Sequence, residues 1–241
     1  MIIGLLFVVL FTYESTVMFK TLAIKIPMIL LFFSVESKRI SLSNSNSKKI
    51  VAVGDLHGDM EKTLETLKMS GVIDDNNHWA LGDNIFVQTG DILDRGPDDE
   101  YIHLFMKELA KQAKKNGGQV VALLGNHEIF NFIGDLKSVH KTLLQGREER
   151  MSIFNTLGEY IRSLPTVALV GDTIFCHGGL SKEYVDILKK YQKLSKKSAG
   201  RVLEFLNYNI ANLLSLKNLD ENDKNFLEHP NSPLFYRGIE Y

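Results

Sequence analysis

Gly90-Asp91-Ile92-Leu93-Asp94-Arg95-Gly96 is the stretch that decides the fold of this chain, and the apolar run Ile85-Phe86-Val87 stands shortly before it. The run has the composition of a buried strand, and glycine permits the tight turn in which such a strand ends. Three further stretches combine glycine with potential ligand side chains after an apolar run: Gly54-Asp55-Leu56-His57-Gly58, Gly125-Asn126-His127-Glu128 and His177-Gly178-Gly179. Together the four motifs predict strand ends that aim their side chains at one shared point.

The apolar runs predict a layered α/β fold. Residues 50–53 are expected to form a buried strand that leads to the first motif, and residues 120–124 a strand that leads to the third. Residues 167–170 and 173–176 flank Gly171-Asp172 and predict a hairpin that leads to the fourth. Apolar residues at helical spacing lie between these strands, at residues 60–67, 102–113 and 153–164. Alternating strands and helices indicate an α/β domain, and the hairpin adds antiparallel pairing.

The N-terminal part differs from the rest of the chain. Residues 1–10 and 26–35 are apolar, but each run is shorter than the roughly 20 residues of a spanning helix. Lys20 and Lys25 precede the second run, and small residues follow it, as in a signal peptide. We therefore expect residues 1–37 to be a signal peptide or membrane anchor, which predicts a secretory or membrane-associated protein. A buried helix or a spurious upstream extension is the alternative.

Composition limits the remaining possibilities. Residues 38–49 are polar and rich in Ser and Asn, which predicts a linker into a folded domain at residues 50–241. With 241 residues, 44% of them hydrophobic, the chain is long enough to bury a good core. A net charge of -1 gives no support for a nucleic-acid partner. The single cysteine, Cys176, excludes an internal disulfide framework and a cysteine-rich zinc site.

The ligand types in the motifs favour a two-metal hydrolytic site. Hydrolysis of a phosphate ester near neutral pH needs a strong nucleophile and positive charge beside the phosphoryl oxygens, and two adjacent divalent ions supply both. Asp55 and His57 are two positions apart and are predicted to bind one ion together. Asp91 is the candidate bridge, and Asn126 and His177 are candidates for the second ion. Mixed Asp, Asn and His ligands suit Mn, Fe or Zn better than Ca.

Side chains beside these ligands supply the other chemistry that the reaction needs. His127 directly follows Asn126 and is the candidate general acid for the leaving alkoxide, with Asp94 to hold its imidazolium. Arg95 offers a planar fork to phosphate oxygens. Glu128 is predicted to be a hydrogen-bond partner rather than a ligand. Any one motif alone is more often a turn or a loop, and only the ordered set of four points to an active site.

The four motifs resemble those of the phosphoprotein phosphatase family of calcineurin-like metallophosphoesterases. Residues 73–83, a long insert before the second motif, and residues 117–121, before the third, resemble the branch called Shewanella-like phosphatases. The resemblance implies a central β-sandwich flanked by helices. It also implies metal ligation by Asp55, His57, Asp91, Asn126 and His177, a proton-donor pair of His127 and Asp94, and phosphate binding by Arg95, Asn126 and Arg237.

The chain departs from the family pattern near its end. The family supplies one more metal-binding histidine after the arginine block at residues 233–238, and no histidine follows His229 here. We therefore expect a C-terminally truncated chain whose sandwich lacks its last strands and whose second metal lacks one ligand.

The leading functional hypothesis is a metal-dependent phosphatase that dephosphorylates proteins or peptides. A dinucleoside polyphosphate hydrolase is one alternative, because related metallophosphoesterases use the same motifs on phosphoanhydrides. An inactive phosphate-binding remnant is another, because of the absent histidine.

Overall fold

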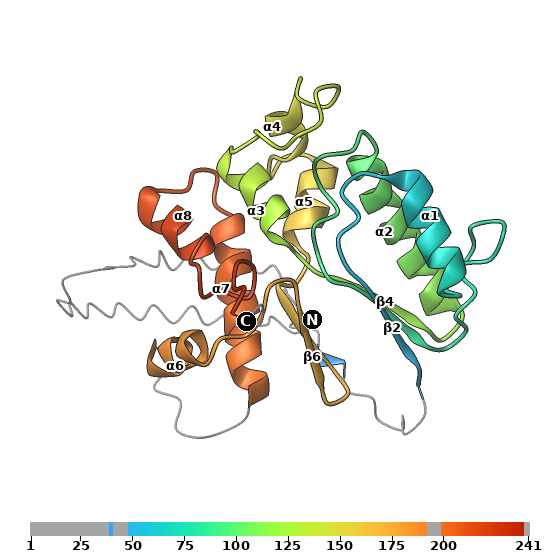
Figure 1. Ribbon diagram of the computed structural model, residues 1–241. Helices are drawn as coiled ribbons and strands as arrows, with labels where there is room; N and C mark the ends of the chain where they lie inside the picture. Colours follow the sequence, from blue (N-terminus) through green and yellow to red (C-terminus); the bar gives the residue numbers. More distant parts are fainter. Residues whose placement is uncertain (1–38, 41–47, 192–198, 239–241) are drawn as a thin grey trace, which may run out of the picture. The chain divides into compact units, whose positions relative to one another are not determined.

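Three of the motifs follow the strands of one parallel sheet in the computed structural model, which describes residues 39–40, 48–191 and 199–238 (Figure 1). The strands are β2 (Ile50–Val53), β3 (Ile85–Gln88) and β4 (Gln119–Ala122), in the order β2-β3-β4. Val53 pairs with Gln88, and Gln88 pairs with Ala122, so the three strands end side by side. The loops that carry the first three motifs therefore leave the same edge of the sheet.

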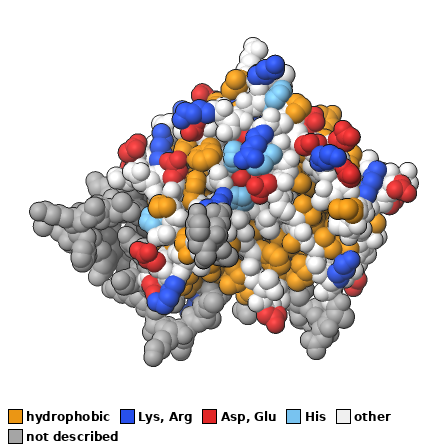
Figure 2. All heavy atoms as spheres, viewed as in Figure 1, with side chains coloured by type: hydrophobic (Ala, Val, Ile, Leu, Met, Phe, Trp, Pro, Cys, Tyr) orange, Lys and Arg blue, Asp and Glu red, His pale blue; other side chains and the backbone are white. Residues whose placement is uncertain are grey.

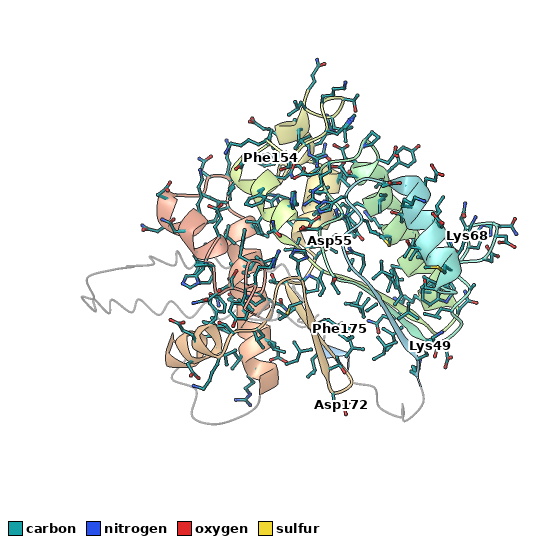
Figure 3. All side chains as sticks on the ribbon, viewed as in Figure 1. Lys49, Asp55, Lys68, Phe154, Asp172 and Phe175 are labelled. Atoms are coloured by element: carbon teal, nitrogen blue, oxygen red, sulfur yellow. The ribbon has the colours of Figure 1, made fainter. Side chains whose placement is uncertain are left out.

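A second sheet carries the fourth motif. Its strands are β1 (Arg39–Ile40), β5 (Val167–Val170) and β6 (Thr173–Cys176), in the order β1-β5-β6. The predicted hairpin is confirmed, because β5 and β6 pair antiparallel around Gly171-Asp172. His177 follows β6 directly, at the opposite end of the hairpin from Asp172, which Figure 3 labels at the tip.

The two sheets pack face to face. Alternate side chains of β3 and β4 point toward β5 and form one apolar cluster with it: Ile85, Val87, Val121, Leu123, Ala168 and Val170. Phe86 and Val120 point to the opposite face, where helices α1 (Met60–Met69) and α2 (Asp99–Lys115) cover the parallel sheet. The period of two along each strand thus places one apolar set between the sheets and another under the helices.

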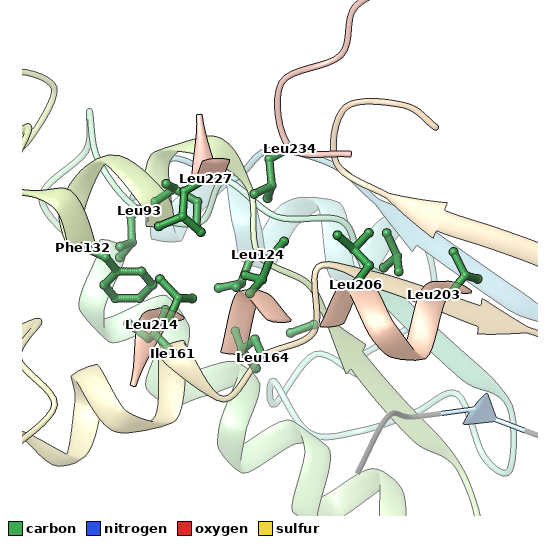
Figure 4. Packing of buried hydrophobic residues seen from close by; sticks show 14 of the residues in the cluster. Leu93, Leu124, Phe132, Ile161, Leu164, Leu203, Leu206, Leu214, Leu227 and Leu234 are labelled. Carbon is green, nitrogen blue, oxygen red and sulfur yellow. The ribbon is translucent and has the colours of Figure 1, made fainter. Parts of the chain in front are cut away.

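A third apolar cluster lies behind the motif loops. It joins α3 (Asn126–Ile133), α5 (Thr156–Arg162), α6 (Lys182–Tyr191), α7 (Ala199–Leu214) and α8 (Glu221–Leu227). Figure 4 shows Leu93, from the second motif, and Leu124, just before the third, among Phe132, Leu214 and the other leucines of this cluster. The loops that carry polar ligands on one side are therefore anchored in the core on the other.

The structure confirms the α/β class and corrects some of the predicted elements. The prediction that β2 is buried is wrong: Ala52 is exposed and the other three residues are half-buried, because β2 lies at the edge of its sheet and pairs only with β3. Helices α7 and α8 and the short α4 (Arg147–Arg150) were not predicted. β1 lies within the stretch predicted as a linker.

The predicted signal peptide or anchor, residues 1–37, lies outside the described residues. The described part of the chain contains no helix that is long and apolar enough to span a membrane.

Candidate metal centre

Backbone hydrogen bonds join the first motif to the second. The amides of Leu56 and His57 both donate to the carbonyl oxygen of Asp91, at 3.0 and 3.1 Å. The amide of Gly58 donates to the carbonyl oxygen of Ile92 at 3.0 Å. The two loops come from neighbouring parallel strands, so the pairing continues the sheet beyond its last residues. It places the side chains of both motifs on one shared surface.

Glu128 holds the second and third motifs together. Its carboxylate is fully buried and accepts from the amides of Asp91, Ile92 and Leu93, each at 3.0 Å, and from that of Gly125 at 2.6 Å. Although burial opposes ionisation, the adjacent His103 imidazole and these amides lower the pKa of Glu128 to about 2. The prediction that Glu128 supports the site through hydrogen bonds is thus consistent with its contacts. Its partners are backbone amides rather than ligand side chains.

Close backbone approach explains two of the motif glycines. Gly90 has a φ of +100°, and a Cβ there would lie 2.5 Å from the amide nitrogen of Gly125. A Cβ at Gly125 would collide with the side-chain oxygen Oδ1 of Asp91. Only glycine therefore lets the third motif approach Asp91 at this point.

Strained backbone is concentrated in the first two motifs. Among the described residues, the non-glycine positions with positive φ are Asn77 and four motif residues: His57, Asp91, Asp94 and Arg95. Such conformations cost about 1–3 kcal/mol each and gather at functional sites. The packing around these loops maintains a geometry that the local sequence alone disfavours.

The imidazole of His57 offers an unused lone pair to an ion. Its Nδ1 lies 2.9 Å from the carbonyl oxygen of Leu93 and donates to it, which leaves Nε2 as the acceptor. That Nε2 is buried, makes no hydrogen bond with any described residue, and lies 3.6 Å from both Asp55 Oδ2 and Asp91 Oδ2. An imidazole lone pair facing two carboxylates is a donor set suited to a divalent cation.

A second group of donors shares Asp91. His177 lies with its Nε2 3.4 Å from Asp91 Oδ2 and its Nδ1 3.8 Å from Asp55 Oδ1. Its Nδ1 also donates to the carbonyl oxygen of Thr89 at 3.2 Å, so the lone pair of Nε2 faces Asn126 Oδ1 at 2.8 Å. Two acceptors this close are favourable only with a cation or a proton between them. The geometry therefore fits two ions that share Asp91.

The guanidinium of Arg237 already places positive charge at this second group. Its Nη2 donates to Asn126 Oδ1 and to His177 Nε2, both at 3.3 Å. The loop of Arg237 packs against the fourth motif, because the amide of Gly178 donates to the carbonyl oxygen of Pro233 at 2.7 Å. The structure thus brings Arg237 to the predicted ligands, and its guanidinium contacts two of them, Asn126 and His177.

Burial and charge set the pKa values of the candidate ligands. Burial and the neighbouring Glu128 carboxylate raise the pKa of Asp91 to about 7. Burial also lowers the pKa of His57, as do the charges of Arg95 and His127, and burial lowers the pKa of His177. Neutral imidazole is the form that binds a metal, and a crowded carboxylate such as Asp91 gains most from an added cation.

His127 lies beside this group but has a different partner. Its Nδ1 donates to Asp94 Oδ2 at 2.8 Å, and its Nε2 lies 3.9 Å from Asp91 Oδ2. Against the opposing effect of burial, the hydrogen bond to Asp94 and the charge of Asp91 raise the pKa of His127. Proximity alone would fit an ion ligand as well. The raised pKa and the carboxylate partner favour the proton donor that the sequence predicts.

Arg95 lies at the exposed rim of the site. Its side chain is exposed, its amide donates to the carbonyl oxygen of Ser138 at 2.9 Å, and its charge lowers the pKa of His57. Figure 2 shows histidine and acidic side chains gathered around a basic one near the centre of the displayed face. Asp55, labelled in Figure 3, is half-exposed at the same place. Every predicted site residue is therefore found in one region.

Sequence reasoning missed a buried network of charged and polar side chains behind His127. Arg147 is fully buried and contacts Asp94, Asp99, Glu100 and Asn131. It lies in Arg147-Glu148-Glu149-Arg150, a charged stretch that is typical of a solvated turn. An arginine in such a stretch carries no periodic signal of burial. We call these five residues the arginine cluster, and Asp55, His57, Asp91, Asn126 and His177 the ligand cluster.

Comparison with known proteins defines the class. Residues 48–241 match the calcineurin-like phosphoesterase family, so the chain belongs to this family, as the motifs predict. Its sequence is similar to Shewanella-like protein phosphatase 2 of Arabidopsis thaliana, with 32% identity over 58% of this chain and 48% of the relative. It is also similar to Shewanella-like protein phosphatase 1 of Plasmodium berghei, with 36% identity over 55% of this chain and 39% of the relative.

A solved structure shows the same fold. The crystal structure of the cold-active protein-tyrosine phosphatase of a psychrophilic Shewanella species superposes with a TM-score of 0.68 at 32% identity. The match covers 80% of this chain and 58% of that protein. The present chain spans about half the length of the relatives it resembles in sequence.

Proposed function

We propose that this chain belongs to a metal-dependent protein phosphatase that hydrolyses phosphate monoesters. The observation that carries the proposal is that imidazole lone pairs from the first and fourth motifs face Asp91 of the second, with His57 Nε2 at 3.6 Å and His177 Nε2 at 3.4 Å from its Oδ2. Family membership supports the same class of chemistry.

The ligand cluster would hold two divalent ions of Mn, Fe or Zn. Asp55, His57 and Asp91 would bind the first, and Asp91, Asn126 and His177 the second. When bound, such a pair lowers the pKa of a water molecule and neutralises charge on the phosphoryl oxygens. The mixed oxygen and imidazole donors support this choice of metals.

The remaining roles fall to side chains at the edge of the ligand cluster. His127 would protonate the leaving alkoxide from Nε2, because its Nδ1 is committed to Asp94. Arg95 and Arg237 would bind phosphate oxygens, since both side chains are exposed at the site and neither pairs with a carboxylate of the described residues. Asn126 would bind phosphate through its amide nitrogen while its oxygen faces the second ion.

The names of the relatives support a phosphorylated protein or peptide as substrate. Two are called protein phosphatases and a third a protein-tyrosine phosphatase. A signal peptide or anchor in residues 1–37, and with it a secretory or membrane location, remains a separate proposal. Mass spectrometry of the mature N-terminus tests it.

Metal-stripped protein tests the function. After chelation and readdition of Mn²⁺, we expect hydrolysis of phosphopeptides that is absent without metal, and slower release of phosphate from diadenosine tetraphosphate. Faster hydrolysis of the dinucleotide would reassign the substrate. A protein that binds no divalent ion and releases no phosphate from either would be a binding protein rather than an enzyme.

A further inference from the structure

Arg147 has the largest fully buried side chain among the described residues, and one of its charged partners, Asp94, holds the candidate acid His127. Its guanidinium donates two hydrogen bonds to Asp99, from Nη1 to Oδ1 at 3.0 Å and from Nη2 to Oδ2 at 2.7 Å. Nη1 also donates to Glu100 Oε1 at 2.8 Å. Against the effect of burial, these carboxylates raise the pKa of Arg147, so the group is a permanent buried cation.

One route from Arg147 to the acid passes through Asn131. The Nε of Arg147 donates to Asn131 Oδ1 at 2.7 Å, which fixes the orientation of that amide. The Nδ2 of Asn131 then donates to Asp94 Oδ1 and to the carbonyl oxygen of His127, both at 2.9 Å. A flipped amide would place its oxygen against Asp94, so Arg147 decides which atom Asp94 meets.

A second route passes through Asp99. The amide of Asp94 donates to Asp99 Oδ2 at 2.7 Å, and Arg147 holds that same oxygen. Asp94 has a φ of +72°, which an isolated residue disfavours. A third contact is direct, because Nη2 of Arg147 lies 3.5 Å from Asp94 Oδ1. All three routes leave Asp94 Oδ2 facing His127.

Stability alone does not account for this arrangement. Buried ion pairs lose about as much in desolvation as they gain, and apolar side chains of the same volume often replace them without loss. Arg162 provides a comparison within the described part of the chain: there its guanidinium donates to the carbonyl oxygens of Met151 and Leu214, and it lies 4.1 Å from the ring centroid of Phe132. That arginine serves packing, whereas the partners of Arg147 converge on Asp94.

We propose that Arg147 is a positioning residue for His127, acting through Asp94, Asn131 and Asp99. The proposal rests on the proposed function, in which His127 protonates the leaving group. Among the described residues, the side chain of Arg147 bonds to Asp94, Asp99, Glu100 and Asn131 and to no member of the ligand cluster. It keeps the Asp94 carboxylate in the one orientation from which the proton donor is held in place.

The test compares leaving groups. A phosphoserine peptide needs a proton on its leaving oxygen, whereas p-nitrophenyl phosphate has a good leaving group that needs less help. For Arg147→Met we expect kcat on the phosphoserine peptide to fall about tenfold more than kcat on p-nitrophenyl phosphate, with KM for both unchanged, since a misplaced acid loses part of a 10²–10⁴-fold effect. Arg147→Lys, which keeps the charge and loses the fork, should fall between the wild type and Arg147→Met.

Arg162→Met is the matched control. It removes a second, largely buried arginine, so it is expected to lower the melting temperature and to leave the ratio of the two kcat values unchanged. Equal losses on both substrates in Arg147→Met, or the same ratio in both methionine variants, would show that Arg147 acts only through stability and would overturn the proposal.

A double variant covers the case in which Arg147→Met leaves Asp99 unpaired and does not fold. Arg147→Met combined with Asp99→Asn removes both charges, and the same shift in the kcat ratio is expected. A readout without turnover is the downfield proton resonance of His127 Nδ1–H in the metal-free protein. We expect it to be lost in Arg147→Met and retained in Arg162→Met, and an unchanged resonance would count against the proposal.

The two proposals fail differently. A wild-type chain that hydrolyses neither substrate with metal present would refute the proposed function. A wild-type chain that hydrolyses both, with an unchanged ratio in Arg147→Met, would refute only the role of Arg147.

Discussion

The ligand cluster and the arginine cluster meet at the two nitrogens of His127 and are built in opposite ways. In the ligand cluster, His57 Nε2 has no hydrogen-bond partner, and His177 Nε2 faces another acceptor at 2.8 Å. In the arginine cluster, both oxygens of Asp94 and both of Asp99 accept hydrogen bonds. Among the described residues, Asp55 and Asp91 of the ligand cluster pair with histidines and with no lysine or arginine, whereas Asp94 and Asp99 of the arginine cluster pair with Arg147.

This difference supports separate roles for the two clusters in the proposed function. Burial of Asp91 and the neighbouring Glu128 carboxylate raise the pKa of Asp91 to about 7, so its charged form is costly although its Oδ1 accepts from the amide of His127 at 2.9 Å. Such a site gains free energy when a cation enters. A satisfied network gains nothing from an added ion and instead restricts the side chains within it. We therefore propose that the ligand cluster binds cations and that the arginine cluster positions His127.

The largest effect is expected from replacement of Asp91, whose carboxylate is shared by both groups of donors in the ligand cluster. Asp91→Asn removes the charge between the two groups of donors, so we expect metal content to fall from about two per chain and turnover to drop by more than about a thousandfold. Metal analysis and phosphopeptide hydrolysis measure both. Unchanged turnover would end the assignment of Asp91 as the bridge.

The same variant should stabilise the metal-free protein at high pH. The pKa of Asp91 is raised from 3.8 to about 7, so its ionisation disfavours the folded state. Its contribution to stability therefore declines as the pH rises from about 4 through 7. Thermal unfolding with chelator should show Asp91→Asn above the wild type at pH 8 and not at pH 4. The opposite order would mean that Asp91 is paired without metal.

Replacement of His127, which lies between the two clusters, tests whether its imidazole is the general acid. For His127→Asn we expect a loss of about a hundredfold on a phosphoserine peptide and a smaller loss on p-nitrophenyl phosphate, since general acids contribute 10²–10⁴-fold. Metal content should stay unchanged, because His127 is not counted among the ligands. A loss of metal would place His127 in the ligand cluster instead.

Glu128 provides the opposite case to Asp91, because its pKa is lowered whereas that of Asp91 is raised. A folded pKa of about 2 against an ordinary value of 4.5 means that Glu128 stabilises the fold above pH 4.5 and that this stabilisation is lost as the pH falls toward 2. Glu128→Gln leaves some buried amides without an acceptor, which costs about 2 kcal/mol. Unfolding at pH 7 and at pH 3 should show a larger deficit at pH 7.

The smallest effect is expected at the exposed rim. Arg237→Ala removes a guanidinium that contacts Asn126 and His177, so inhibition by inorganic phosphate should weaken by about tenfold, or 1.4 kcal/mol. Lys68→Ala, an exposed lysine on α1 far from Asp55 in Figure 3, is the control. Equal phosphate inhibition in both variants would remove Arg237 from phosphate binding.

The sequence predicts the residues of the ligand cluster because each stands beside a glycine at a strand end. The same signals predict β3, β4 and the β5–β6 hairpin. They do not reveal that β2 is an edge strand, because four apolar residues in a row are equally compatible with an edge and a centre. Burial on each face depends on neighbours that a single sequence does not identify.

The arginine cluster illustrates a second limit of sequence reasoning. Arg147 is 48 residues from Asp99, and nothing in its surroundings along the chain marks it as buried. The long-range carboxylates that make its burial tolerable are visible only once the chain is folded. Helix α7 is a different case, since Val202, Leu206 and Ile210 recur at helical spacing and would have predicted it.

The four amides gathered by Glu128 have a consequence for how an ion enters and leaves. One carboxylate joins the backbone of the second motif to the start of α3 through four amide hydrogen bonds, which fixes the spacing of Asp91 and Asn126. Under the proposed function, the backbone rather than the bound ions would set the spacing of the ligands. We therefore expect the protein to exchange one transition metal for another without rearrangement of the chain.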